Sequence, residues 1–115
     1  MKDTMNYACW GTHYELKFIR GTYQNNGNTA VQIMCKTDGE DFYEPFAMLT
    51  VNLKSMKSPY KACIDTNNLG MNVDLLAHLE SEGVYRETDS YIISGYCTYP
   101  VVEFDHEWLD SLTKM

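Results

Sequence analysis

The feature that most constrains the fold is a pair of alternating segments separated by an Asn- and Gly-rich turn. Residues 14–20 and 29–36 alternate apolar with polar or charged side chains, which is the period-two pattern of a half-buried strand. Residues 25–28 read Asn-Asn-Gly-Asn, and these residue types tolerate the positive φ of tight turns. The pattern predicts an antiparallel hairpin.

Further apolar runs extend this hairpin. Residues 43–53 form a third predicted strand, with Pro45 at its start or on an edge, because proline cannot donate a ladder hydrogen bond. A short fourth strand is expected at residues 60–65. Two more are expected at residues 91–93 and 98–104.

Two helices are predicted in the second half of the chain. Asn72 is a good N-cap for a helix whose apolar residues recur at helical spacing through residues 73–80 and which ends near Gly83. Asp105 is expected to cap a last short helix. Its apolar stripe consists of Trp108, Leu109 and Leu112.

The order β-β-β-β-α-β-β-α predicts an α+β protein. We expect an antiparallel meander sheet of five to six strands, with both helices packed on one face. The chain has 115 residues, and single domains usually have about 100–150, so residues 1–115 are expected to form one domain.

Charge is unevenly distributed along the chain. The formal net charge is −7, made of +2 over residues 1–37 and −9 over residues 38–115. An acidic surface repels phosphate backbones, so direct binding of nucleic acid is not expected. An acidic face can instead occupy a basic groove on another protein. Plain solubility is the alternative explanation.

Several common activities lack their sequence signals. No phosphate loop, G-x-G-x-x-G, G-x-S-x-G or H-E-x-x-H motif occurs, and no C-x-x-C pair suggests structural zinc. We therefore expect no metal, no cofactor and no assigned catalytic residue. The start of the chain lacks a signal-peptide pattern, and no apolar run reaches the roughly 20 residues of a membrane span. The expected setting is a reducing cytoplasm with free thiols.

An acidic and aromatic run at residues 38–44 is a candidate partner-binding segment. Its carboxylates suit Lys and Arg on a partner, while an aromatic ring anchors the contact. The alternative is a solvated turn. The candidate residues are Asp38, Glu40, Asp41, Phe42, Tyr43 and Glu44.

Two further segments, residues 65–70 and 94–100, are candidates for a ligand or partner surface. Polar groups at strand ends and exposed tyrosines are common at binding sites. The alternatives are an Asx-turn that leads into the helix, and cross-strand aromatic packing. The candidate residues are Asp65, Asn67, Asn68, Tyr96 and Tyr99.

Cys97 is the strongest candidate for a nucleophile. It would need a base that lowers its pKa, and His78 or His106 could supply one. No local motif signals either pair, and a cysteine in a strand more often packs in the core. We therefore favour a packing role for Cys97.

The second half of the chain resembles a known family. The similar stretches are residues 62–68 (Ala-Cys-Ile-Asp-Thr-Asn-Asn), the helix at residues 75–83, and residues 94–105, which include Ser-Gly-Tyr-Cys-Thr-Tyr-Pro. They are similar to a small bacterial family of unknown function carried by phages, plasmids and conjugative elements. The resemblance covers residues 60–112 and implies a setting on mobile DNA in bacteria, but no activity.

These observations lead to three hypotheses. The first is a binding protein that inhibits or modulates a host complex, such as a CRISPR nuclease with basic nucleic-acid channels. Its expected partner is a host protein with a basic surface. The second is a small ligand-binding domain or enzyme, with a site between residues 65–70 and 94–100. The third is a homodimer formed through an exposed sheet edge.

Overall fold

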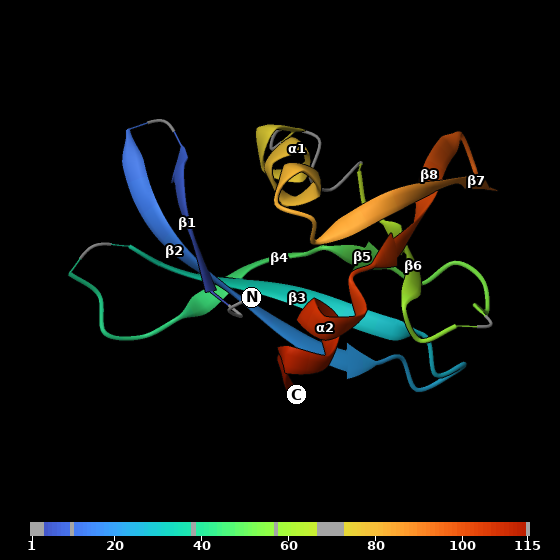
Figure 1. Cartoon of the computed structure of the whole chain (residues 1–115), viewed down its shortest axis with the longest axis horizontal. Coiled ribbons are helices and arrows are strands. Elements are labelled where there is room, and N and C mark those ends of the chain that lie inside the picture. Colours follow the sequence, from blue (N-terminus) through green and yellow to red (C-terminus); the bar gives the residue numbers. More distant parts are fainter. Residues whose placement is uncertain (1–3, 10, 38, 57, 67–72, 115) are drawn as a thin grey trace.

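The residues that the structure describes form two β-sheets and two helices (Figure 1). The computed structural model of the chain describes residues 4–9, 11–37, 39–56, 58–66 and 73–114. Strand pairing is mostly antiparallel, so the predicted α+β class is confirmed at this level. Neither described helix is long and apolar enough to cross a membrane.

The first sheet contains five strands. Four of them lie in the order β1 (Thr4–Cys9), β2 (Thr12–Thr22), β3 (Thr29–Thr37) and β4 (Glu44–Met48). The short β9 (Thr113–Lys114) pairs with β2 in parallel. Strand β2 therefore lies inside the sheet, between β1 and β3.

The predicted hairpin is confirmed as β2 and β3. The two strands pair antiparallel from Tyr14 opposite Thr37 to Thr22 opposite Thr29. Gly27 lies in the intervening turn with a φ of 72°, and its backbone amide donates to the Tyr23 carbonyl at 2.8 Å. The Asn- and Gly-rich segment thus forms the turn that its composition predicts.

The second sheet contains four strands. Their spatial order is β5 (Thr50–Val51), β6 (Lys61–Ile64), β8 (Cys97–Phe104) and β7 (Tyr85–Ser94), all antiparallel. Strand β7 begins six residues before the predicted start at Tyr91. The two strands predicted at residues 91–93 and 98–104 therefore exist, and the first is longer than expected.

The predicted third strand is divided between the two sheets at Leu49. The Leu49 amide donates to the Val31 carbonyl at 2.9 Å, and the Leu49 carbonyl accepts from the Asp65 amide at 3.0 Å. β4 lies before this residue and β5 after it. The prediction of one meander of five to six strands was therefore wrong, since the strands form two sheets. Strands β1 and β9 were not predicted.

The helices are α1 (Val73–Ser81) and α2 (His106–Ser111). The Asp105 carboxylate accepts from the Trp108 amide at 3.0 Å, which confirms the predicted cap of α2. Gly83 follows α1 with a φ of 78°, whereas the predicted cap Asn72 lies outside the described residues. The expected packing of both helices on one face of a single sheet is not confirmed.

One core joins both sheets and both helices. The Trp108 ring packs edge-on against Phe18 of β2, with centroids 5.4 Å apart, and stacks with Phe104 of β8 at 5.8 Å. In Figure 1, α2 accordingly lies beside both β2 and the end of β8. Buried core residues also include Leu16, Val31, Ile33, Leu49, Ile64, Leu75, Leu79, Val102, Leu109 and Leu112.

Candidate functional site

The acidic segment at residues 39–44 connects β3 to β4, and part of it is used within the fold. The Glu40 carboxylate accepts from the Thr37 amide at 2.9 Å and from the Thr37 hydroxyl, and these hydrogen bonds lower the pKa of Glu40. Glu40 therefore stabilises the turn that follows β3. Asp38 lies outside the described residues.

Tyr43 packs against the first sheet. Its hydroxyl donates to the Glu15 carboxylate, and its ring lies under the ammonium groups of Lys36 at 5.0 Å and Lys17 at 5.6 Å. Lys36 also forms an ion pair with Glu15 at 3.3 Å. The hydrogen bonds from Tyr43 and Lys36 lower the pKa of Glu15. Tyr43 thus fastens this loop to β2 and β3.

The remaining part of the acidic segment is exposed. The Phe42 side chain is 80% exposed, and Asp41 and Glu44 on either side are also exposed. A groove of about 620 Å³ lies beside the segment, and its lining includes Lys36 and Glu40. The role of this segment as a partner surface stays a prediction, with Asp41, Phe42 and Glu44 as exposed members.

The second pair of candidate segments is brought together only in part. The pairing of Cys63 with Val101 directs the end of β6 toward Tyr99 of β8. A cavity of about 190 Å³ is lined by residues from both segments, including Thr66 and Pro100. Asn67 and Asn68 lie outside the described residues.

Tyr96 lies apart from that cavity. It occupies the turn between β7 and β8, and it is fully exposed. Tyr99 is half-buried three residues further along, roughly 10 Å at the rise of a strand. Asp65 and Tyr96 therefore belong to different parts of the surface.

Cys97 and His106 cannot form a nucleophile–base pair. Cys97 begins β8, and His106 follows the end of that strand, so roughly 23 Å of strand separates them. The His106 imidazole instead contacts the Glu103 carboxylate at 3.1 Å and stacks on Tyr60 with centroids 3.7 Å apart. Cys97 is half-buried on its strand.

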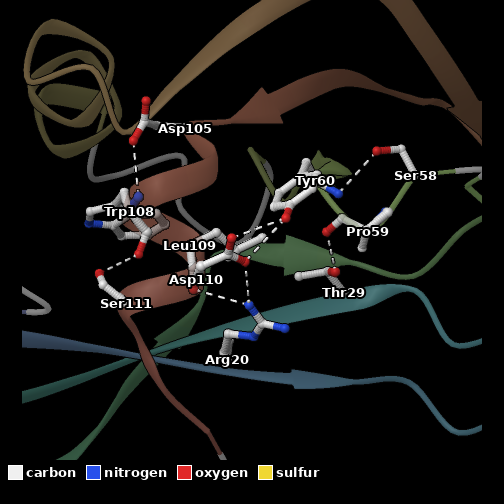
Figure 2. A network of polar contacts seen from close by, with 10 residues as sticks. All are labelled: Arg20, Thr29, Ser58, Pro59, Tyr60, Asp105, Trp108, Leu109, Asp110 and Ser111. Atoms are coloured by element: carbon white, nitrogen blue, oxygen red, sulfur yellow. Dashed lines mark hydrogen bonds and ion pairs between the residues drawn. The ribbon is translucent and has the colours of Figure 1, made fainter.

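A polar network fastens α2 to both sheets (Figure 2). The Asp110 carboxylate accepts from the Arg20 guanidinium of β2 at 3.2 Å and from the Tyr60 hydroxyl at 3.1 Å. Arg20 also donates to the Leu109 carbonyl at 3.2 Å. These residues are far apart in sequence, so no local pattern predicts the network. Its hydrogen bonds hold α2 in place, so we assign the network a structural role.

The network continues along the surface from His106. Glu103 binds both His106 and the Arg86 guanidinium, the latter at 2.7 Å, and the hydrogen bond from His106 makes the largest contribution to lowering the pKa of Glu103. Arg86 and His106 thus both bond to the Glu103 carboxylate. Within the described ranges, no three side chains among His, Cys, Asp and Glu are placed to hold a metal ion.

Among the described residues, three of the four exposed large apolar side chains lie on the β7–β8 hairpin. Tyr91 is 59% exposed and Ile93 is 75% exposed, beside the fully exposed Tyr96. Tyr91 and Ile93 are two residues apart, so they lie on the same face of β7. The alternation pattern predicts a strand here but does not predict its exposure. The absence of any charge in residues 90–94 was the available signal.

The sequence of the chain matches a family model over residues 18–115. The chain belongs to this family, which is described as a domain of unknown function (DUF4313). Comparison with curated proteins and with solved structures finds no match. The expected membership of an uncharacterised family is therefore confirmed, and the match extends well beyond residues 60–112.

Proposed function

We propose that this domain is a non-enzymatic binding protein that inhibits or modulates a host complex that handles nucleic acid. The observation that carries the proposal is the group of exposed Tyr91, Ile93 and Tyr96 side chains on one hairpin. Tyrosine and large apolar residues are enriched where protein interfaces gain most of their energy. A hairpin that exposes them has a surface suited to a protein partner.

The charge of the chain supports a basic partner. Residues 38–115 carry a balance of −9, and the exposed part of the acidic loop adds Phe42 between Asp41 and Glu44. Such a surface accelerates association with a positively charged protein. A protein with a groove for DNA or RNA has that charge, and an acidic domain competes with the nucleic acid there.

The proposed setting is a bacterial cytoplasm, with the gene on a phage, plasmid or conjugative element. Small acidic proteins from such elements often act against host defence by direct contact. A CRISPR nuclease is a suitable target, because its heteroduplex lies in a positively charged channel. The support for this setting is the resemblance of the motifs at residues 62–68 and 94–100, together with the acidic charge.

The alternative function, a small ligand-binding domain or enzyme, has weaker support. The cavity between its two expected segments has a volume of about 190 Å³. Pockets for small ligands usually have about 300–1,000 Å³. Further candidate residues, Asp65 and Tyr96, lie in different parts of the surface.

Affinity capture from a bacterial lysate tests the proposal. The tagged full chain should retain a basic, nucleic-acid-handling complex, and added DNA or RNA should compete with it. Tyr96→Ser should weaken retention by about tenfold or more, as expected for an interface anchor. His13→Ser is the matched control, since it removes an exposed ring from β2 of the other sheet.

The same variants should be compared in cells. Expression of the chain should restore plating of a phage that the host CRISPR system restricts, and Tyr96→Ser should reduce this effect. If the chain retains no partner and leaves restriction unchanged, the proposal is wrong.

A further inference from the structure

We propose that the outer edge of β7, at residues 90–94, binds an extended segment of a partner protein as an added β-strand. The segment would alternate apolar residues with Lys or Arg. This inference rests on the proposed function, and it identifies the contact surface and the kind of segment that fits it.

Strand β7 has an open edge. It is the last strand in the order β5-β6-β8-β7, and no strand among the described residues pairs with its outer side. Natural proteins usually protect such edges with charges, prolines or bulges. Residues 90–94 contain no charge and no proline. The protective features lie earlier in β7, at the register shift between Glu87 and Tyr91 and at Asp89, whose φ is 69°.

The hairpin register directs backbone groups toward this edge. The turn has two residues, Gly95 and Tyr96, and Gly95 has a φ of 61°. A tight turn of this kind is closed by a hydrogen bond between the residues that flank it, here Ser94 and Cys97. Hydrogen-bonded and non-hydrogen-bonded pairs then alternate along the ladder. Ile93 accordingly belongs to a non-hydrogen-bonded pair.

The same alternation applies to Tyr91, which lies opposite Pro100. Proline has no amide hydrogen, and a non-hydrogen-bonded position does not require one from it. The N–H and C=O groups of Tyr91 and Ile93 therefore point away from β8 and toward the open edge. An added strand would pair with these four groups.

Side-chain exposure coincides with this backbone geometry. Tyr91 and Ile93 are 59% and 75% exposed on the same face of β7. A strand paired with them would place its own apolar residues beside them, as cross-strand neighbours. The residues with outward backbone groups are thus also the residues with exposed apolar side chains, the combination used in β-strand addition.

Charge determines the kind of segment. Glu87 and Asp89 on β7 and Glu80 and Glu82 at the end of α1 are exposed. The nearby Arg86 is paired with Glu103. Lys and Arg in the added strand would complement these carboxylates, whereas a second copy of this chain carries a net charge of −7 and repels them.

A peptide of alternating Lys and Val tests the inference with the full chain. Fluorescence anisotropy should show binding of the labelled Lys–Val peptide and none of a matched Glu–Val peptide. Hydrogen exchange followed by NMR should slow about tenfold or more at the amides of Tyr91 and Ile93. Peptide effects confined to other amides, or equal binding of both peptides, would overturn the inference.

A pair of variants separates backbone pairing from side-chain contact. Ile93→Pro removes an outward N–H without removing a bond to β8, and Ile93→Ala keeps that N–H. We expect Ile93→Pro to bind the Lys–Val peptide about tenfold more weakly than Ile93→Ala. Equal binding would refute strand addition. If Ile93→Pro does not fold, the exchange measurement on the natural chain decides the question.

Two further outcomes are distinguishable. If Ile93→Pro still captures the lysate partner at full strength, the partner binds elsewhere, so the proposed function stands and the β7 inference fails. If sizing shows a dimer that Ile93→Pro abolishes, the occupant of the edge is a second copy and the inference is wrong. A failure to capture any partner contradicts the proposed function instead.

Discussion

The two hairpins of the molecule have the same local design and opposite surroundings. β2–β3 and β7–β8 are both antiparallel pairs with a glycine of positive φ in the turn. The first pair is flanked by β1 and β4, and four of its inward side chains are at most 1% exposed. The side chains buried to this degree are Leu16, Phe18, Val31 and Ile33, while Tyr14 and Cys35 pack partly buried against the same core.

The β7–β8 hairpin extends from the core into solvent. Its base supplies Val102 and Phe104 to the core, whereas Tyr91 and Ile93 toward its tip are largely exposed and Tyr96 is fully exposed. In Figure 1 the tip of this hairpin lies away from the other elements. Alternating apolar residues therefore have two uses here. In one hairpin they stabilise the fold, and in the other they form a surface.

The largest expected difference concerns stability. Phe18→Ala should lower the free energy of unfolding by about 3–5 kcal/mol, because it removes a buried ring that packs on Trp108. Ile93→Ala should change it by only about 0.5 kcal/mol, because the side chain is exposed. Urea unfolding followed by tryptophan fluorescence measures both. Equal losses would contradict the comparison.

A matched pair of glycine variants tests the turns. Gly27→Ala and Gly95→Ala each impose roughly 1–2 kcal/mol of backbone strain, since their φ values are 72° and 61° and an added Cβ meets no atom within 4 Å. We expect Gly27→Ala to lower global stability by this amount. The strain of Gly95→Ala should instead be relieved by local opening of the hairpin tip. Hydrogen exchange would detect this as faster exchange at Ile92 and Ser94, whose amides the register directs toward β8, with β2 unchanged. Slower exchange there would argue against a locally opening tip.

Tyr85 marks the point where β7 leaves the core. Burial raises the pKa of its hydroxyl from 10.0 to about 12, and this hydroxyl donates to the Leu76 carbonyl at 3.1 Å. Because folding favours the neutral hydroxyl, Tyr85 makes its full contribution to the stability of the fold below pH 10. This contribution is lost as the pH rises through about 12. Spectrophotometric titration of Tyr85→Phe should lack one late-ionising tyrosine. An unchanged late phase would contradict the assignment.

The smallest expected effect is at the loop beside the first hairpin. Hydrogen bonds from Tyr43 and Lys36 lower the pKa of Glu15 below its ordinary 4.5. Their stabilisation is present above pH 4.5 and is lost as the pH falls through the lower folded value. Glu15→Gln should therefore flatten the acid side of the stability curve in urea unfolding. The exposed Glu44→Gln is the control, and an equal change in both variants would refute the assignment.

The sequence predicted features whose signals are local. The β2–β3 turn, the cap of α2 at Asp105 and the buried face of Trp108 all follow from residues within one turn or one element. The break at Leu49 could not be predicted in this way. Ala47, Leu49 and Val51 alternate without interruption, and nothing in the pattern indicates that two sheets share the segment.

The candidate site was predicted less well, because its partners come from elsewhere in the chain. Tyr43 is held by Glu15 and Lys36, which the β2–β3 register brings together. The exposure of β7 depends on sheet order, which the alternation of one strand cannot show. Glu40 is the exception, since Thr37 lies three residues before it and the contact is local.

The position of Leu49 determines how this molecule can be dissected. Its amide and carbonyl bond to Val31 and Asp65, so a single residue links the hydrogen-bond ladders of both sheets. A cut or truncation there would leave two fragments with unpaired edges and half a core each. Deletion mapping would therefore report loss of folding rather than loss of contact, and epitope mapping on this chain has to rely on surface point substitutions.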